Sequence, residues 1–293
     1  MTRILNMGSI NIDYVYTVPH FVQAGETLSA SSRRIFPGGK GMNQSIALAR
    51  AGANVVHAGM VGSDGNELLT VLQDAGVDTR LVSQSDSPTG HTFIQINPDG
   101  QNCILLFSGA NQRLDEAFVD EALSTFSKGD ILVLQNEVSC IDYAMKKAKA
   151  KGMDIAFNPS PFGPEIAGYS LDLVDFWLLN EIEGQALTEK SKPLEMLDAM
   201  GKIYPNATIV LTLGEDGVLC LEKGSVLRHG SYKVDVIDTT AAGDTFTGYF
   251  ISSVAAGTNT AEALRLASVA ASISVSRIGA AVSIPHWDEV VKK

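Results

Sequence analysis

The sequence predicts an α/β fold in which a largely parallel central β-sheet is flanked by helices on both faces and carries a small β-sheet lid. Three observations predict it. Apolar strand segments alternate with amphipathic helix segments along most of the 293 residues, glycines end several helix segments, and two β-rich stretches interrupt the alternation. Strand–helix alternation is typical of a parallel sheet that is buried on both faces.

The first strand and the first helix show how the elements are assigned. Residues 3–8 form a short apolar run, which predicts a buried strand. Residues 41–51 place Met42, Ile46 and Ala49 on one helical face, and Gly52 ends the helix. The same reasoning predicts strands at 55–61, 130–134, 154–157, 176–179 and 208–213, and helices at 66–75, 141–151, 242–256 and 260–276.

The β-rich stretches predict a second, smaller sheet. They comprise residues 14–18 with 27–36, and residues 89–97 with 102–107 around an Asn-Pro-Asp-Gly turn. Strands without crossover helices do not belong in a doubly wound core. We therefore expect one domain over residues 1–293, with lid segments at about 13–36 and 89–107. The lid either closes over a ligand or is an edge extension without a moving role, and the pattern alone favours neither.

Composition and charge exclude several classes of protein. With 45% hydrophobic and 19% charged residues the chain is typical of globular proteins, and its net charge of −11 excludes nucleic acid and anionic membranes as main partners. No apolar stretch reaches the roughly 20 residues that span a membrane. The scattered Cys103, Cys140 and Cys220 favour a reduced, cytoplasmic location. The five isolated histidines make a histidine-built zinc site a poor interpretation.

The strongest local signal is Asp-Thr-Thr-Ala-Ala-Gly-Asp at residues 238–244. Small residues let the backbone turn tightly into a helix, so that free N–H groups at its start point at one place. Such a site attracts anions and suits the charge of a transferring phosphoryl group. Asp244 stands at the same point, where a carboxylate can take a proton from an attacking hydroxyl. The alternative is that Asp244 only caps the helix, which is the commoner role of a lone Gly-Asp pair.

A second glycine-rich run, Phe-Pro-Gly-Gly-Lys-Gly-Met-Asn-Gln, occupies residues 36–44. Its glycines allow the backbone to approach a small ligand closely at the start of a helix, where Lys40 and Asn43 supply polar groups. Taken alone, such a run is more often a flexible turn. It is not a P-loop, because the Gly-x-x-x-x-Gly-Lys-Ser/Thr spacing is absent.

Two further groups of polar residues follow predicted strands. Asn11 and Asp13 come after the first strand with period-two spacing, so they can face the same way and bind vicinal sugar hydroxyls. Asn180 and Glu183 follow the strand at 176–179 and offer hard oxygen atoms that suit Mg²⁺ beside nucleotide phosphates. The alternatives are a turn held by Asx hydrogen bonds in the first case and a capped, solvent-facing helix start in the second.

A fifth segment, Leu-Thr-Leu-Gly-Glu-Asp-Gly at residues 211–217, ends a predicted strand in a glycine turn. The turn can pass close to a nucleotide. On its own it is an ordinary hairpin or loop signal.

Together these segments resemble the PfkB-type carbohydrate kinase family and, within it, the ribokinases. The resemblance covers nearly the whole chain in the expected order. It rests on the segments already described and on Ala24-Gly25-Glu26-Thr27, Gln135-Asn136-Glu137 and Asn158-Pro159-Ser160-Pro161. The Gly-Gly-Lys-Gly-x-Asn-Gln and Asp-Thr-x-Ala-Ala-Gly-Asp motifs in this order are highly specific. A ribokinase-like fold is therefore implied.

The resemblance also implies a role for each matching residue. The sugar site would be lined by Asn11, Asp13, Gly39, Lys40, Asn43 and Glu137. ATP would be contacted by Asn180, Thr212, Gly214, Glu215, Gly217 and Gly243, with Ser268 near the adenine. Glu183, with Asn180, would organise Mg²⁺ through water. An activating K⁺ would meet Asp238, Thr240, Ser274, Arg277, Gly279 and Ser283, mostly through backbone oxygens. Asp244 would be the base, beside an anion hole of amides from Ala241, Ala242, Gly243 and Asp244.

The implied reaction transfers the γ-phosphoryl group of ATP to a primary hydroxyl of a sugar, with ribose to ribose 5-phosphate as the first expectation. The lid would also serve as a homodimer interface. Three positions depart from the ribokinase pattern, namely Gly90-His91-Thr92-Phe93, Phe107-Ser108-Gly109 and Ser268. They leave a nucleoside kinase or a ketohexose kinase open as alternatives.

Two more distant alternatives come from other classes. A sugar-binding regulator without catalysis is opposed by the complete Ala-Ala-Gly-Asp run and by Glu183. A nicotinamide oxidoreductase is opposed by the segment after the first strand, which lacks the Gly-x-Gly-x-x-Gly fingerprint.

Overall fold

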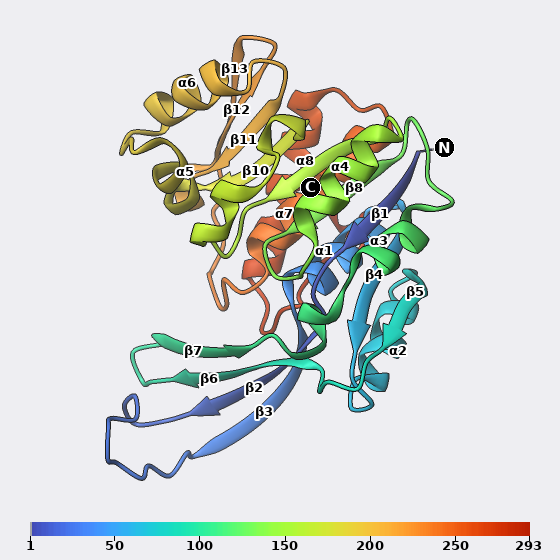
Figure 1. The fold of residues 1–293 in the computed structure, drawn as a ribbon. Helices are drawn as coiled ribbons and strands as arrows, with labels where there is room; N and C mark the ends of the chain where they lie inside the picture. The colour runs from blue at the N-terminus through green and yellow to red at the C-terminus, as the bar shows by residue number, and fades with distance from the viewer. Residues whose placement is uncertain (1) are drawn as a thin grey trace.

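A nine-stranded sheet forms the centre of the protein in the computed structural model, which describes residues 2–293 (Figure 1). In spatial order its strands are β13 (Ser225–His229), β12 (Val218–Glu222), β11 (Thr208–Thr212), β10 (Phe176–Asn180), β9 (Asp154–Asn158), β8 (Ile131–Gln135), β1 (Arg3–Met7), β4 (Asn54–Val61) and β5 (Asp78–Gln84). All neighbours from β11 to β5 pair in parallel, and only β12 and β13 are antiparallel. This arrangement confirms the predicted fold class.

Helices cover both faces of this sheet. One face carries α1 (Lys40–Arg50), α2 (Asn66–Asp74), α7 (Ala242–Ala255) and α8 (Thr260–Val275). The other carries α3 (Glu116–Leu123), α4 (Ile141–Ala150) and α6 (Pro193–Ile203). The short helices α5 (Glu181–Thr188) and α9 (Trp287–Val290) complete the set. Strand β8 shows why two layers form, because Ile131 and Val133 face the first cluster while Leu132 and Leu134 face the second.

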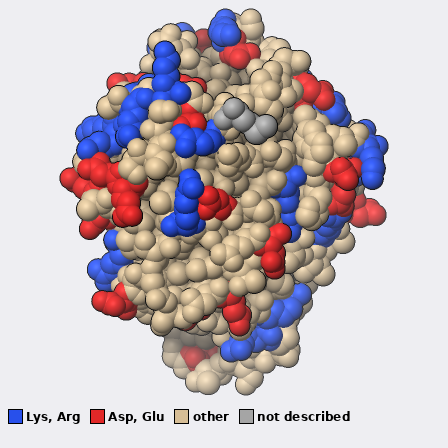
Figure 2. Space-filling view, turned by 90° about the vertical axis from the view of Figure 1, so that its right-hand side faces the viewer, with Lys and Arg blue, Asp and Glu red and all other residues tan. Residues whose placement is uncertain are grey.

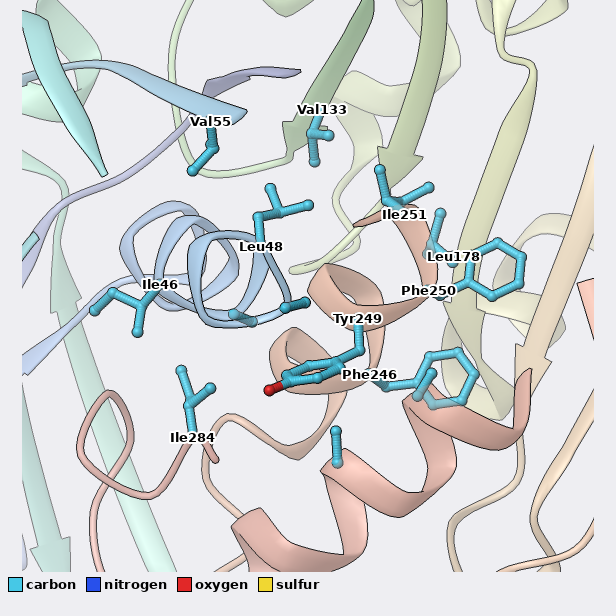
Figure 3. Packing of buried hydrophobic residues seen from close by; sticks show 14 of the residues in the cluster. Ile46, Leu48, Val55, Val133, Leu178, Phe246, Tyr249, Phe250, Ile251 and Ile284 are labelled. Atoms are coloured by element: carbon cyan, nitrogen blue, oxygen red, sulfur yellow. The ribbon is translucent and has the colours of Figure 1, made fainter. Parts of the chain in front are cut away.

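The helices α1 and α7 cross closely beneath the sheet (Figure 3). Ile46 and Leu48 of α1 lie beside Tyr249 and Phe250 of α7 in one buried cluster. The crossing depends on Gly248, since a Cβ atom at that position would overlap Ala47 and the backbone of Leu48. The close approach brings the first turn of α1 against the first turn of α7.

Three sheet strands and three helices lie outside the elements that the sequence pattern predicts. They are β5, β12, β13, α3, α6 and α9. The edge strands β5 and β13 are only partly buried, so their sequences lack the continuous apolar run of a central parallel strand. Predicted and observed bounds of the remaining core elements differ by one or two residues, which is the usual fraying of element ends.

The lid is a separate four-stranded sheet that projects from the core (Figure 1). Its order is β3 (Ser32–Gly38), β2 (Asn11–Thr17), β6 (Gly90–Ile96) and β7 (Asn102–Phe107). The expected strand at 27–36 begins later, at Ser32. Three residues join β1 to β2, so the carboxyl end of the central sheet opens toward the lid. The lid therefore makes its own sheet and does not extend an edge of the central sheet.

Acidic and basic side chains are mixed on the surface. Figure 2 shows a face on which basic side chains are interspersed with acidic ones, in keeping with 22 basic and 33 acidic residues in the chain. Between residues 2 and 293, no helix is both long enough and apolar enough to cross a membrane.

Candidate active site

The carboxylate of Asp244 lies where α1 and α7 meet. Asp244 is the third residue of α7, is 7% exposed, and makes no capping bond to its own helix. Its Oδ2 accepts a hydrogen bond from Asn43 Nδ2 at 3.0 Å, and its Oδ1 accepts one from Gln44 Nε2 at 2.9 Å. The capping interpretation of Asp244 is therefore wrong. Two helices hold this carboxylate at the junction of the two glycine-rich motifs.

The first turn of α7 supplies backbone N–H groups beside that carboxylate. Ala241 precedes the helix in the left-handed conformation, with φ 61°, which turns the chain sharply into α7. The Gly243 and Asp244 N–H groups have no carbonyl partner among the described residues and are free to bind an anion, whereas the Ala242 N–H donates to the Thr239 carbonyl at 3.3 Å. A Cβ atom at Gly243 would meet no protein atom within 4 Å, which means that this turn faces open space.

A cavity of about 210 Å³ opens in front of these amides. The residues that line it and that the sequence predicts for the site are Lys40, Asn180, Glu183, Thr212, Ala241, Ala242, Gly243 and Asp244. The residues that line it and that sequence reasoning did not assign to the site are Asn158, Ser160, Leu178, Leu179, Thr239, Phe246 and Thr247. Asn158 ends the parallel strand β9, and strand ends of this kind are the usual ligand-binding positions, so a signal for it existed.

Lys40 is the basic residue at the centre of the cavity. Burial opposes its protonation, but the negative charges of Asp244, Glu137 and Glu183 outweigh burial and raise the pKa of Lys40. Its ammonium group is therefore charged at neutral pH. It is well placed to attract an anionic ligand into an otherwise acidic site.

Asn180 and Glu183 form a reciprocal cap at the start of α5. The Glu183 N–H donates to Asn180 Oδ1 at 3.0 Å, and Glu183 Oε2 accepts from the Asn180 N–H at 2.9 Å. The expected capped helix start is thus present. Its residues Asn180 and Glu181 are exposed, as the alternative expected, but the Glu183 carboxylate is only 4% exposed, and Asn180 and Glu183 both line the cavity.

On the lid side, Asn11 and Asp13 lie on one face of strand β2 and are not part of an Asx turn. Asn11 Oδ1 accepts from Asn111 Nδ2 at 2.7 Å, and Asp13 Oδ1 accepts from Thr92 Oγ1 at 2.6 Å. Burial raises the pKa of Asp13 despite the Thr92 hydrogen bond. Thr92 and Asn111 are functional neighbours that sequence reasoning missed, since only the fold pairs them with β2.

Glu137 connects the lid side to the start of α1. Its Oε2 accepts from the Lys40 N–H at 3.0 Å and from the hydroxyl of Ser9. Burial raises the pKa of Glu137, and the charge of Lys40 opposes this effect. Gly39, the residue before α1, lies within the same loop contact, against Ser9 and Asn11. The residues expected for a sugar site therefore surround one end of α1.

Of the remaining nucleotide-site candidates, only Thr212 lines the cavity. Thr212 ends β11 and lines the cavity, while Gly214, Glu215 and Gly217 form the turn into β12. That turn is a hairpin, because β11 and β12 are antiparallel. Ser268 is a buried residue of α8 and does not line the cavity.

The expected cation residues come together in two pairs of contacts. The carboxylate of Asp238 accepts from the Thr240 N–H at 2.9 Å and from the Gly279 N–H at 3.0 Å. The hydroxyls of Ser274 and Ser283 lie 2.8 Å apart. The Arg277 side chain pairs with Glu289, so only its backbone remains for a cation. In the part of the chain that the structure describes, no group of three His, Cys, Asp or Glu residues could hold a metal alone.

Known proteins are similar to this chain over nearly its whole length. Curated ribokinases of Haemophilus influenzae and Staphylococcus aureus are 36% and 34% identical to the chain, each over 98% of it and over 96% and 98% of their own lengths. The crystal structure of Cryptococcus neoformans ribokinase with ADP superposes with a TM-score of 0.87 at 34% identity, covering 100% of this chain and 99% of that one. Arabidopsis thaliana ribokinase with ribose and ATP gives 0.86 at 29% identity, covering 100% and 98%. The profile of the pfkB family carbohydrate kinases matches residues 1–287. The chain therefore belongs to the pfkB family of carbohydrate kinases.

Proposed function

We propose that this kinase transfers the γ-phosphoryl group of ATP to a primary hydroxyl of ribose, forming ribose 5-phosphate and ADP. The observation that carries the proposal is the position of Asp244, which lies both at the first turn of α7 and in contact with Asn43 of the sugar-side motif. The ribokinase relatives, one of which binds ribose and ATP, support this substrate pair.

The reaction needs one base and one site for negative charge. Asp244 takes the proton of the sugar hydroxyl as that oxygen forms a bond to the γ-phosphorus and the bond from phosphorus to the β-phosphate oxygen breaks. A positioned general base contributes about 10²–10⁴ in rate. The amides of Ala241, Ala242, Gly243 and Asp244 hold the charge on the transferring group.

The sugar would bind at the lid end of α1. Asp13 and Glu137 offer carboxylates, and Asn11 and Asn43 offer amides that can donate and accept, as vicinal hydroxyls require. Lys40 adds a positive charge between the sugar and the phosphoryl group. The lid sheet stands over this end of the core, where it can exclude water as a competing acceptor.

The nucleotide would bind from the cavity toward the β11–β12 turn. Asn180 and Thr212 line the cavity and would contact phosphates, while the backbone of Gly214, Glu215 and Gly217 would pass along the nucleotide. The adenine would reach toward Ser268 on α8.

The donor set fits Mg²⁺ bound mainly through water and phosphate. Glu183 is a buried carboxylate at the cavity wall, beside the amide of Asn180, and hard oxygen atoms of this kind suit Mg²⁺. When bound, Mg²⁺ would neutralise charge on the phosphates. The residues also fit a K⁺ site, because the segments at 238–240 and 274–283 meet through Asp238 and Gly279 and can offer backbone carbonyls.

A substrate panel tests the acceptor. We expect ATP consumption with ribose to exceed that with fructose, 2-deoxyribose, adenosine or inosine, in the presence of Mg²⁺, and to rise when K⁺ is added. The measurement is ADP release coupled to product identification by mass spectrometry. Preferential use of a nucleoside or of fructose would replace ribose by that acceptor. Tight sugar binding with no product from any compound would favour a non-catalytic regulator.

We also propose that the lid mediates a homodimer. Strand β7 is fully exposed, with Ile104 at 55% and Leu105 at 69%, and an unpaired apolar edge of this kind favours association. We expect the protein to sediment as a dimer and the double substitution Ile104→Lys and Leu105→Lys to sediment as a monomer in analytical ultracentrifugation. Ile203→Lys, at an exposed apolar position of α6, is the control and should remain dimeric. A monomeric parent protein would contradict the proposal.

The cysteines are consistent with a cytoplasmic enzyme, which we also propose. Cys103, Cys140 and Cys220 are all free thiols, and none forms a disulfide. A reducing compartment keeps such thiols in this state.

A further inference from the structure

A continuous line of buried amide side chains lies behind Asp244. Gln44 Nε2 donates to Asp244 Oδ1 at 2.9 Å, and Gln135 Nε2 donates to Gln44 Oε1 at 2.7 Å. The second hydrogen of the same Gln135 nitrogen goes to Asn6 Oδ1, at 2.9 Å. Gln44, Gln135 and Asn6 are all 0% exposed. Solvent does not compete for these hydrogen bonds, and two further buried contacts support them, from Asn6 Nδ2 to the Gly41 carbonyl at 2.8 Å and from Gln44 Nε2 to Asn158 Oδ1 at 3.3 Å.

The line continues away from the site through Ser45 to His57. Asn6 Nδ2 donates to Ser45 Oγ at 2.8 Å, and Ser45 Oγ lies 2.7 Å from His57 Nδ1. Burial lowers the pKa of His57 to about 4, against a smaller opposing effect of the Gly8 carbonyl. The imidazole is therefore neutral at pH 7. Because Ser45 Oγ already accepts from Asn6, its own hydrogen is available to donate to His57.

On the side away from Asp244, Gln135 fixes the orientation of the Gln44 amide. Gln135 uses both hydrogens of one nitrogen, toward Asn6 and toward Gln44, while its Oε1 lies against Gly8 with no hydrogen-bond partner among residues 2–293. The reverse orientation of Gln135 would place that oxygen against two acceptor oxygens. The reverse orientation of Gln44 would place an oxygen against the carboxylate of Asp244. Each reversal would replace an N–H donor by an oxygen that faces another oxygen. In a buried site, a polar group without a hydrogen-bond partner destabilises the fold.

The other amide at the carboxylate is not held in this way. Asn43 Nδ2 donates to Asp244 Oδ2, but Asn43 Oδ1 is buried and has no hydrogen-bond partner in the described part of the chain. Reversing Asn43 would also set its Oδ1 against the carboxylate, but it would break no second hydrogen bond, whereas reversing Gln44 would also lose its contact with Gln135. Of the two amides that donate to Asp244, only Gln44 accepts a hydrogen bond from a second buried side chain, that of Gln135.

We propose that Gln135 is a positioning residue for the phosphoryl transfer. Gln135 donates to Gln44 Oε1 and so keeps the NH2 group of Gln44 directed at Asp244. The Gln44 NH2 group in turn holds the carboxylate of Asp244 in the orientation that meets the acceptor hydroxyl. Gln135 is 0% exposed and does not line the cavity, so its side chain is not available to touch either substrate. The proposal rests on the assignment of Asp244 as the base.

Two substitutions at Gln135 remove the anchor without changing the size of the side chain greatly. Gln135→Met removes both donated hydrogen bonds, and Gln135→Glu keeps the shape but can donate at most one. We expect either change to lower kcat by about 10–100-fold while the KM values for sugar and ATP stay within about threefold, because small displacements of a reacting group cost rate rather than binding.

Ser45→Ala is the matched control on the opposite branch. It breaks the line between Asn6 and His57 but leaves the Gln135–Gln44–Asp244 contacts in place. We expect it to lower the Tm while kcat stays within about threefold of the parent. If Ser45→Ala lowers kcat as much as Gln135→Met does, the network has only a general structural role and the proposal is wrong.

A double-mutant cycle separates this inference from the assignment of the base. Gln135→Met is measured in the parent and in the Asp244→Asn background, using labelled ATP to follow residual transfer. If Gln135 acts through Asp244, its effect should disappear once the carboxylate is gone. An equal effect in both backgrounds would overturn the positioning role. An active Asp244→Asn protein would instead overturn the base assignment.

Discussion

Asp244→Asn is expected to lower kcat by about 10²–10⁴-fold while sugar and ATP still bind. The substitution removes the proton acceptor but keeps the size and shape of the side chain. Fluorescence or calorimetric titration should therefore give Kd values for sugar and ATP within a few-fold of the parent. Loss of both binding and turnover would point to a misfolded site and would not test the base.

The fold should tolerate this change. In the parent protein both oxygens of Asp244 accept from amides, and an introduced amide nitrogen would face one donor. Rotation of Asn43 brings its unpaired Oδ1 to that nitrogen and restores a hydrogen bond. Asp198→Asn, at an exposed carboxylate paired with Lys202 on α6, is the control and should retain full turnover. Near-parent activity of Asp244→Asn would show that the base lies elsewhere.

Gly243→Val is expected to lower kcat/KM by about 10²–10³-fold, comparable to the loss of an anion-hole donor. A side chain at this position meets no protein atom within 4 Å, so the helix accommodates it. It projects into the cavity in front of the first-turn amides, where the phosphoryl charge would gather. The Tm should change little, because the substitution neither overlaps the core nor removes a hydrogen bond.

The control for Gly243→Val is Gly168→Val. Gly168 also has no neighbour within 4 Å of an added Cβ atom, but it lies in a surface turn at residues 164–168, outside the cavity. We expect the control to keep both activity and Tm. Steady-state kinetics of the two variants give kcat/KM, and thermal unfolding gives Tm. Retained kcat/KM in Gly243→Val would exclude the first turn of α7 as the phosphoryl site.

Much of the core follows from local sequence pattern. Parallel strands that are buried on both faces need continuous apolar runs, and β1, β8 and β11 each have one. Helix α1 could be predicted because its apolar spacing is regular and a glycine follows it. The edge strands β5 and β13 could not, since an edge strand with partial burial carries a mixed sequence that also suits a loop.

Some residues of the site could also be predicted from the local sequence, and others could not. Asp244, Asn180 and Glu183 stand in compact motifs at element ends, so residue type and position sufficed to single them out as candidates. Thr92 and Asn111 each acquire their meaning from a partner 79 or 100 residues away. A threonine in a lid strand carries no local sign that it will meet a carboxylate on a neighbouring strand.

By itself, the sequence determined the central strands, the helices with regular apolar spacing and the two glycine-rich helix starts, because backbone turns and apolar spacing are local properties. Only the tertiary structure decided that Gln44 and Gln135, separated by 91 residues, would meet behind Asp244. It did so through the close crossing of α1 and α7 and the pairing of β1 with β8. Hydrogen-bond direction in a buried network depends on every partner at once, so no single segment of the chain contains it.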